Sequence, residues 1–240
     1  MDTASHDFAR VALATLAICK VILLFAFAPL NLPDSGGYAQ YADSILANRN
    51  WLTHIDLQSE PFPILAFRMA GYPLLMATAK LLFGPFSWYG LVLVQIAFSL
   101  YVTYRFWRCL GHIGLGSSWA LAGAACQATG LIFWLDQCLL TDSIYVSLVT
   151  LATVLLVESC LDHKVSVSRF LGIGVILALA FLLREASAVL FLLLVPAVYS
   201  AARGVGANAT YSAVLTAALL IPLLATNFGY RAWNELRTGR

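Results

Sequence analysis

The chain has 240 residues, of which 61% are hydrophobic and 11% are charged, and its formal net charge is +2. An average soluble domain carries about 25% charged residues, so this composition argues against a water-soluble protein. The small net charge argues against a nucleic-acid partner. Apolar runs of membrane-spanning length recur along the chain, and in hydrocarbon such runs must form their backbone hydrogen bonds internally. We therefore expect an all-α protein, a polytopic transmembrane helical bundle.

The apolar runs predict seven spans, at about 9–30, 87–107, 117–134, 143–160, 168–183, 186–201 and 210–228. Lys20 interrupts the first run, which we interpret as a retained helix rather than a cleaved signal. Residues 170–200 are apolar except for Arg184 and Glu185. Because charges in the middle of one span are costly, we predict two helices that join at this pair.

Residues 31–86 form a long amphiphilic stretch that contains the short apolar segment 71–83. At 1.5 Å per residue this segment is too short to cross a bilayer. If it nevertheless spans, all later loops invert and the basic loops lie outside. If it lies at the interface, the basic loops lie inside, as the positive-inside rule favours. We therefore expect a cytoplasmic N-terminus and an outer-face loop of interfacial helices over 31–86.

Two polar positions fall in this predicted outer loop. In a helix that follows the first span, Asp34 and Tyr38 lie on one face, together with Tyr41. The Asp34 carboxylate could accept a proton from a nucleophile, or it could simply cap the helix. Arg68 precedes the segment 71–83, where its planar donors could bind a lipid phosphate or it could snorkel to the interface.

Two more polar positions fall on the same predicted side of the membrane. Asp142 begins a predicted helix, where a carboxylate can serve chemistry or favour the helix N-terminus. Arg184 and Glu185 form a charged pair that could instead be an interfacial anchor. Taken together, a base, a second carboxylate and two arginines suit transfer of a group from a phosphate.

Several short motifs along the chain, taken in order, resemble those of a known enzyme family. They are Asp34-Ser35 with Tyr38 and Ala42, then Arg68-Met69-Ala70-Gly71-Tyr72-Pro73 closing with Leu82-Phe83-Gly84, then Thr141-Asp142-Ser143, Arg184-Glu185-Ala186, and Pro222 with Asn227-Phe228. In this order the chain resembles the GT-C membrane glycosyltransferases, especially the group with protein O-mannosyltransferases and the lipid A aminoarabinose transferase. The chain departs from that group at Ser35, where an acidic residue is common, and at Ser143, where a proline is common.

The resemblance implies a membrane glycosyltransferase that moves a sugar from a polyprenyl-phosphate donor to a hydroxyl or amine of a lipid, glycan or protein acceptor. It also implies a bacterial plasma (inner) membrane as the location. It implies Asp34 and Asp142 as catalytic carboxylates and Arg68 and Arg184 as ligands of the donor phosphate. The substrate-pocket residues would be Tyr38, Tyr72 and Glu185. Neither the motifs nor the resemblance assigns a cofactor. A divalent metal near the two carboxylates is compatible with this chemistry, although no His/Cys cluster indicates one.

The resemblance covers residues 10–232, so we expect residues 1–232 to form one GT-C-like catalytic module and 233–240 to be a charged tail. Members of that group are considerably longer, which implies that these residues correspond to the N-terminal half of such an enzyme. The alternative is a non-enzymatic multi-pass protein: a transporter, a lipid flippase or an inactive scaffold of this fold. A transporter would favour polar groups at mid-membrane, and Lys20 is the one clear mid-span charge in the sequence.

Overall fold

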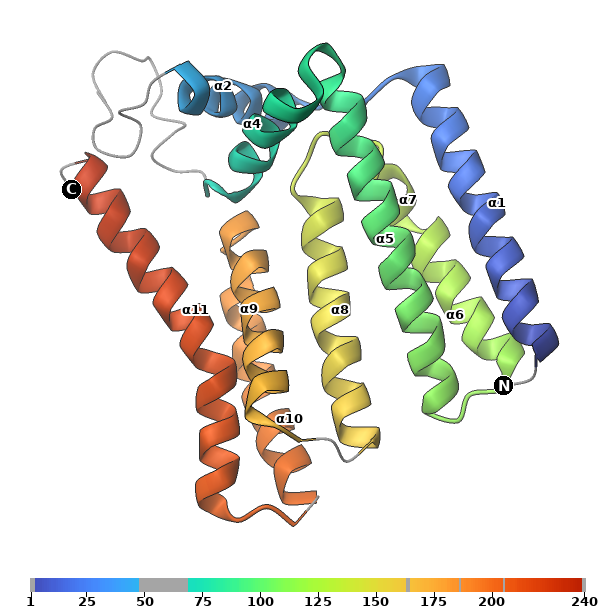
Figure 1. Cartoon of the computed structure of the whole chain (residues 1–240), viewed down its shortest axis with the longest axis vertical. Coiled ribbons are helices and arrows are strands. Elements are labelled where there is room, and N and C mark those ends of the chain that lie inside the picture. The colour runs from blue at the N-terminus through green and yellow to red at the C-terminus, as the bar shows by residue number, and fades with distance from the viewer. Residues whose placement is uncertain (1–2, 48–68, 163–164, 186, 205, 239–240) are drawn as a thin grey trace.

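The computed structural model describes residues 3–47, 69–162, 165–185, 187–204 and 206–238 (Figure 1). It is 87% helical and contains no strand in these residues. The one β-type pairing among them is an isolated bridge between Leu30 and Cys138. The prediction of an all-α fold is therefore confirmed.

The first half of the chain places two helices across one end of the bundle (Figure 1). In chain order its elements are α1 (Thr3–Phe27), α2 (Pro33–Ala47), α4 (Gly71–Phe83), the 3₁₀ helix η2 (Gly84–Phe86), α5 (Ser87–His112), α6 (Ser117–Thr129) and α7 (Leu131–Leu135). Gly84 has a positive φ of 53°, which glycine adopts without steric cost, and it turns the chain from α4 towards α5. We call the end that carries α2 and α4 the α2–α4 end.

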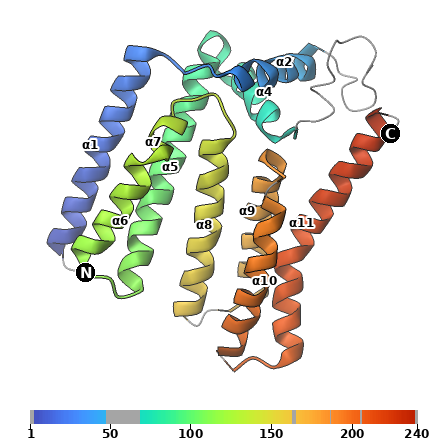
Figure 2. The ribbon, with the colours of Figure 1, turned by 180° about the vertical axis from the view of Figure 1, so that it is seen from behind.

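The second half consists of α8 (Asp142–Leu161), α9 (Val167–Leu183), α10 (Ser187–Gly204) and α11 (Ala209–Thr238). Helices α1, α6, α9 and α11 run towards the α2–α4 end, while α5, α8 and α10 run away from it (Figures 1 and 2). The N-terminus therefore lies at the opposite end of the bundle, and the C-terminus lies at the α2–α4 end.

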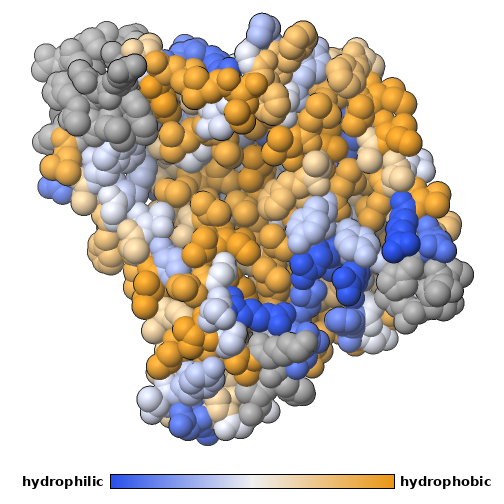
Figure 3. All heavy atoms as spheres, viewed as in Figure 1, coloured by the Kyte–Doolittle hydropathy of each residue, from blue (hydrophilic) through white to orange (hydrophobic). Residues whose placement is uncertain are grey.

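Four helical segments among the described residues are long and apolar enough to cross a membrane: Asp7–Phe27, Gly71–His112, Asp142–Leu161 and Ala209–Leu236. The helix Val167–Leu183 is apolar but shorter. Apolar residues cover most of the face in Figure 3, and hydrophilic residues gather at its upper edge and over its lower part. This surface is compatible with a protein that lies in a bilayer.

The helix boundaries differ from the sequence prediction at one internal position. The predicted break at Arg184–Glu185 is confirmed, because α9 ends at Leu183 and α10 begins at Ser187. The prediction of one helix over 117–134 is wrong, because the chain leaves helical geometry at Gly130. There ψ is −149°, and a Cβ atom would lie 2.8 Å from the carbonyl oxygen of Cys126.

Close helix contacts hold the second half together. Gly174 of α9 lies against α11, where a Cβ atom would meet the carbonyl oxygen of Leu219 at 2.4 Å. At the end opposite to α2 and α4, Glu158 of α8 accepts a hydrogen bond of 2.6 Å from Arg105 of α5 and lies 3.8 Å from Arg169 of α9. Glu158 therefore links three helices at this end.

Candidate active site

The candidate site begins with an ion pair between Asp142 and Arg184. Asp142 is the first residue of α8, and Arg184 follows the last residue of α9. An Arg184 guanidinium nitrogen donates to the Asp142 carboxylate, and the guanidinium lies 5.8 Å from the centre of the Tyr145 ring. The Arg184 side chain is 46% exposed and that of Asp142 is 26% exposed, so a ligand can reach both. The sequence predicted both residues as site members, and the fold brings them together.

Two tyrosines connect this ion pair to the helices that cross the bundle end. The ring of Tyr38 on α2 meets the ring of Tyr72 on α4 edge to face, with 5.4 Å between centroids. Burial, and after it the charges of Tyr38, Cys138 and Asp142, raise the pKa of the Tyr72 hydroxyl well above its ordinary value. Tyr72 has no exposed surface, so in this structure it supports the site from beneath rather than lining its surface.

Helix α2 carries the predicted base. Asp34 is exposed in the first turn of α2, one turn before Tyr38, so the predicted helix is confirmed, whereas Tyr41, predicted on the same face, is buried. The neighbouring Ser35 is buried: its hydroxyl accepts a 3.0 Å bond from the Leu32 N–H and donates a 2.9 Å bond to the Leu139 carbonyl. Ser35, at a position where the resemblance would favour an acidic residue, thus fastens α2 to the segment that precedes α8.

Helix α4 is held at both of its ends. A Cβ atom on Gly71 would lie 2.4 Å from the Leu182 carbonyl oxygen, so only glycine allows this approach to α9. Near the other end, Lys80 forms an ion pair with Asp43 of α2 and lies 5.0 Å from the centre of the Trp88 ring. These contacts fix α4 between α2 and the C-terminal end of α9.

Beneath the site lies a buried polar cluster, which we call the Asp136 network. Lys20 of α1 forms an ion pair with Asp136, and the two side chains are 1% and 0% exposed. The same carboxylate accepts hydrogen bonds from Ser99 of α5 and Ser143 of α8. Burial of an ion pair is tolerated where such extra hydrogen bonds satisfy the charged groups, and this carboxylate has three donors.

A glutamine extends this network to α4. Gln95 of α5 donates to the carbonyl oxygens of Asp136, at 3.3 Å, and of Cys138, at 3.0 Å. Its own side-chain oxygen accepts a 2.8 Å bond from the Tyr72 hydroxyl. The Asp136 network therefore reaches two residues of the candidate site: Tyr72 directly, and Asp142 through its neighbour Ser143.

The segment between α7 and α8 is also fixed through its backbone. Leu30 donates to the Gln137 carbonyl at 2.8 Å and accepts from the Leu139 N–H at 3.1 Å. The Gln137 amide donates a 3.1 Å bond to the Lys20 carbonyl. These bonds hold the segment between α7 and α8 against α1 and against Leu30, which follows α1.

No protein-family model, curated protein or solved structure matches this chain. The resemblance to GT-C enzymes therefore rests on the sequence motifs alone and stays an expectation.

The remaining predicted site residues stay predictions. Arg68 lies outside the described residues. Glu185 is exposed beside Arg184, in the turn between α9 and α10. The described residues contain no group of three or more His, Cys, Asp or Glu that could hold a metal ion, so they suggest no metal ligand set beyond the two carboxylates.

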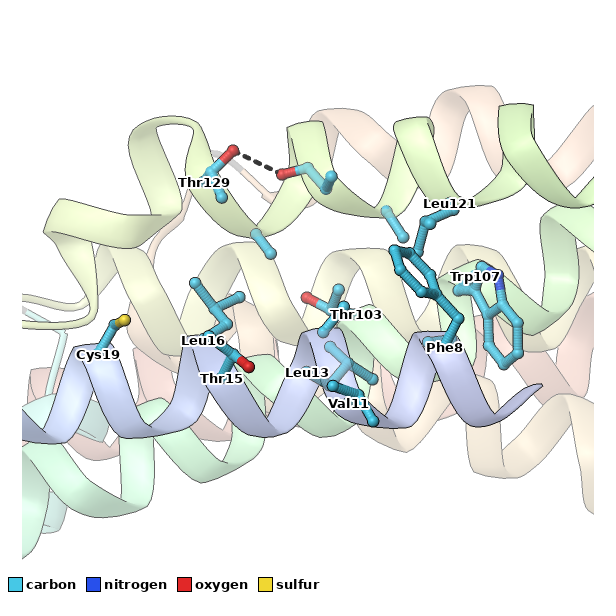
Figure 4. Close-up of a pocket in the computed structure, with 15 residues that line it drawn as sticks. Phe8, Val11, Leu13, Thr15, Leu16, Cys19, Thr103, Trp107, Leu121 and Thr129 are labelled. Carbon is cyan, nitrogen blue, oxygen red and sulfur yellow. Dashed lines mark hydrogen bonds between the residues drawn. The ribbon is translucent and has the colours of Figure 1, made fainter. Parts of the chain in front are cut away.

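An apolar cavity of about 480 Å³ lies away from this site, between α1, α5 and α6 (Figure 4). It follows α1 from Phe8 to Cys19, and Trp107 and Leu121 line its other side. Because its lining is almost entirely apolar, it suits hydrocarbon rather than a sugar or a phosphate. The Asp142–Arg184 pair, by contrast, lies at the α2–α4 end.

Sequence reasoning identified Lys20 as unusual but missed its partner. No sequence pattern assigned a role to Asp136, Gln95 or Ser99. One signal was available: an ionisable group inside an apolar helix usually pairs with another polar group, and Asp136 follows an apolar run directly. The hydrogen-bonding set around the carboxylate required the tertiary structure.

Proposed function

We propose that this chain is the catalytic module of a multi-pass membrane glycosyltransferase that uses a polyprenyl-phosphate-linked sugar. In this proposal the membrane is spanned by α1, α5, α6 together with α7, α8, α9, α10 and α11, and the α2–α4 end faces the outside. The donor's hydrocarbon tail lies among the helices, and its phosphate and sugar lie at the outer surface.

The observation that carries the proposal is the accessible Asp142–Arg184 ion pair beside α2 and α4. A planar guanidinium can bind two phosphate oxygens at once, and Arg184 is exposed enough to exchange Asp142 for a phosphate. Asp34 is exposed one turn from Tyr38 on the neighbouring helix. This arrangement suits a reaction that needs a cation for the leaving phosphate and a carboxylate for the incoming nucleophile.

The proposed reaction is a displacement at the anomeric carbon. Asp34 accepts the proton of the acceptor hydroxyl or amine as the new bond to the sugar forms. The bond between the anomeric carbon and the phosphate oxygen breaks, and polyprenyl phosphate leaves with the electron pair. Arg184 stabilises the negative charge on that phosphate, and Asp142 orients Arg184.

A non-enzymatic transporter is the second candidate, and the buried Lys20–Asp136 pair favours it. Paired ionisable groups inside a bundle often belong to ion or proton pathways. The exposed carboxylates and the arginine at the bundle end favour surface chemistry instead.

Binding of undecaprenyl phosphate to the purified protein, with undecaprenol as the phosphate-free control, tests the proposal. The phosphate should increase affinity in the wild type. Arg184→Ala should lower affinity for undecaprenyl phosphate by about tenfold or more, Arg184→Lys should lower it less, and neither should change undecaprenol binding. Equal affinity of the wild type for the two lipids would exclude the phosphate role.

A further inference from the structure

The Asp136 network lies next to the candidate site without belonging to its exposed surface. Lys20 and Asp136 are buried, so neither can contact a sugar or an acceptor from the bundle surface. Any effect of this pair on the site must therefore pass through the residues to which it is bonded.

Two chains of hydrogen bonds connect Asp136 to the site, one from its side-chain carboxylate and one from its backbone carbonyl. One carboxylate oxygen accepts from Ser143, the second residue of α8, whose neighbour is Asp142. The backbone carbonyl of Asp136 accepts from Gln95, which in turn accepts from the Tyr72 hydroxyl. A displacement of Asp136 would therefore shift both the start of α8 and Tyr72 on α4.

Lys20 determines where Asp136 lies. Its ammonium group pairs with the carboxylate oxygen that also accepts from Ser99, and it lies 5.4 Å from the centre of the Phe133 ring. The Gln137 side chain donates to the backbone carbonyl of Lys20 itself. Helix α1 therefore holds both Asp136 and the residue after it.

We infer that the Lys20–Asp136 ion pair is a positioning element that sets Asp142 and Tyr72 in the candidate site. The effect of this element on donor binding rests on the proposed function, whereas its effect on the start of α8 does not. A purely structural ion pair would only have to fill space and avoid an unpaired buried charge. A positioning element must in addition keep the carboxylate that accepts from Ser143.

The double variant Lys20→Met/Asp136→Leu separates these roles. Apolar residues of similar size can replace a buried ion pair with little loss of stability, but leucine cannot accept a hydrogen bond from Ser143. The readouts are the thermal midpoint, hydrogen–deuterium exchange of residues 139–146, and affinity for undecaprenyl phosphate.

We expect the double variant to recover most of the thermal midpoint lost by Lys20→Met alone. We also expect exchange over residues 139–146 to be about tenfold faster than in the wild type and exchange over 153–160 to be unchanged. Affinity for undecaprenyl phosphate should fall by about tenfold, with undecaprenol binding unchanged. Recovery of the midpoint together with wild-type exchange and affinity would overturn the proposal.

A second pair of variants decides the question if the double variant is unstable. Ser143→Ala removes only the donor to Asp136 from α8. Ser147→Ala is the matched control, because Ser147 is also buried, lies one turn further along α8 and is not one of the three side-chain donors to the Asp136 carboxylate described here. Faster exchange over 139–146 in Ser143→Ala alone supports the proposal, and equal exchange in the two variants contradicts it.

The exchange measurement also separates this inference from the proposed function. If the wild type does not distinguish undecaprenyl phosphate from undecaprenol, the proposed function fails. The exchange over residues 139–146 still decides whether the ion pair positions the start of α8. If the wild type binds the phosphate but the double variant exchanges and binds as the wild type does, only the positioning role fails.

Discussion

Arg184 and Asp142 are 42 residues apart in the sequence, and their side chains form an ion pair at the α2–α4 end. The pair joins the C-terminal end of α9 to the N-terminal end of α8, where the helix dipole also favours a carboxylate. Asp34 lies at the same end of the bundle, at the start of α2, so the predicted carboxylates and one predicted arginine share one end.

The role of Asp34 as a base can be tested by a substitution that keeps its size and removes its charge. Asp34 is the second residue of α2, where a negative charge stabilises a helix by only about 0.3–1 kcal/mol, so Asp34→Asn should change the thermal midpoint little. Loss of the base should lower the rate of transfer from a polyprenyl-phosphate sugar by about 10²–10⁴-fold. The matched control is Asp7→Asn, an exposed carboxylate at the opposite end of the bundle, which should retain activity. Near-normal transfer by Asp34→Asn would make Asp34 a structural residue.

The Lys20–Asp136 pair should be important for stability. Lys20→Ala leaves the buried Asp136 carboxylate without its counter-ion and should cost about 3–5 kcal/mol of unfolding free energy. Lys80→Ala breaks the Lys80–Asp43 pair, whose carboxylate side chain is 62% exposed, and should cost about 1 kcal/mol or less. Thermal unfolding in detergent compares the two variants, and equal losses would contradict the burial argument.

Gly71 should be intolerant of a side chain. In Gly71→Ala the new Cβ would lie 2.4 Å from the Leu182 carbonyl oxygen, and relief of that clash should cost about 1–3 kcal/mol. Gly36 of α2 has no atom within 4 Å of the position of a Cβ. Gly36→Ala should therefore be neutral or stabilise α2 by up to about 1 kcal/mol. Thermal midpoints measure both effects, and a neutral Gly71→Ala would argue against the close contact of α4 with α9.

Cys138 should react slowly with alkylating reagents, and its reaction rate should rise at a higher pH than that of an ordinary thiol. Burial, and secondly the charge of Asp142, raise the pKa of the Cys138 thiol above its ordinary value. The reactive thiolate therefore forms only at higher pH. Alkylation of an exposed Gln40→Cys thiol should be half-maximal at about pH 8.5 and level off about one pH unit higher, whereas that of Cys138 should still rise there. Asp142→Asn should shift the Cys138 profile to lower pH; an unchanged profile would contradict the contribution of Asp142.

The proposed orientation predicts opposite labelling of the two bundle ends. Gln40 on α2 and Ser168 on α9 are exposed at opposite ends. In intact cells an impermeant maleimide should label Gln40→Cys, and it should label Ser168→Cys only after the membrane is permeabilised. The wild type, with its five cysteines, gives the background. The reverse pattern would invert the proposed topology.

The sequence alone determined which segments are helical and where the main interruption lies. Hydrophobic runs and helical periodicity are local properties, so the all-α class and the face shared by Asp34 and Tyr38 followed from neighbouring residues. The charged pair Arg184–Glu185 predicted the end of α9 for the same local reason, since charges are costly within one apolar helix. The α6–α7 break at Gly130 was missed because one glycine in an apolar run does not by itself end a helix.

Only the tertiary structure decided which polar groups meet. The partner of Lys20 lies 116 residues away, and its position depends on how α1 packs against α5 and on the path of the segment between α7 and α8. The burial of Tyr72 likewise depends on where α4 crosses the bundle end, and Gly71 allows that crossing by its lack of a side chain. Hydrogen bonds and ion pairs act only over a few ångströms, so a pattern along the chain can show that a buried charge needs a partner but cannot say which residue supplies it.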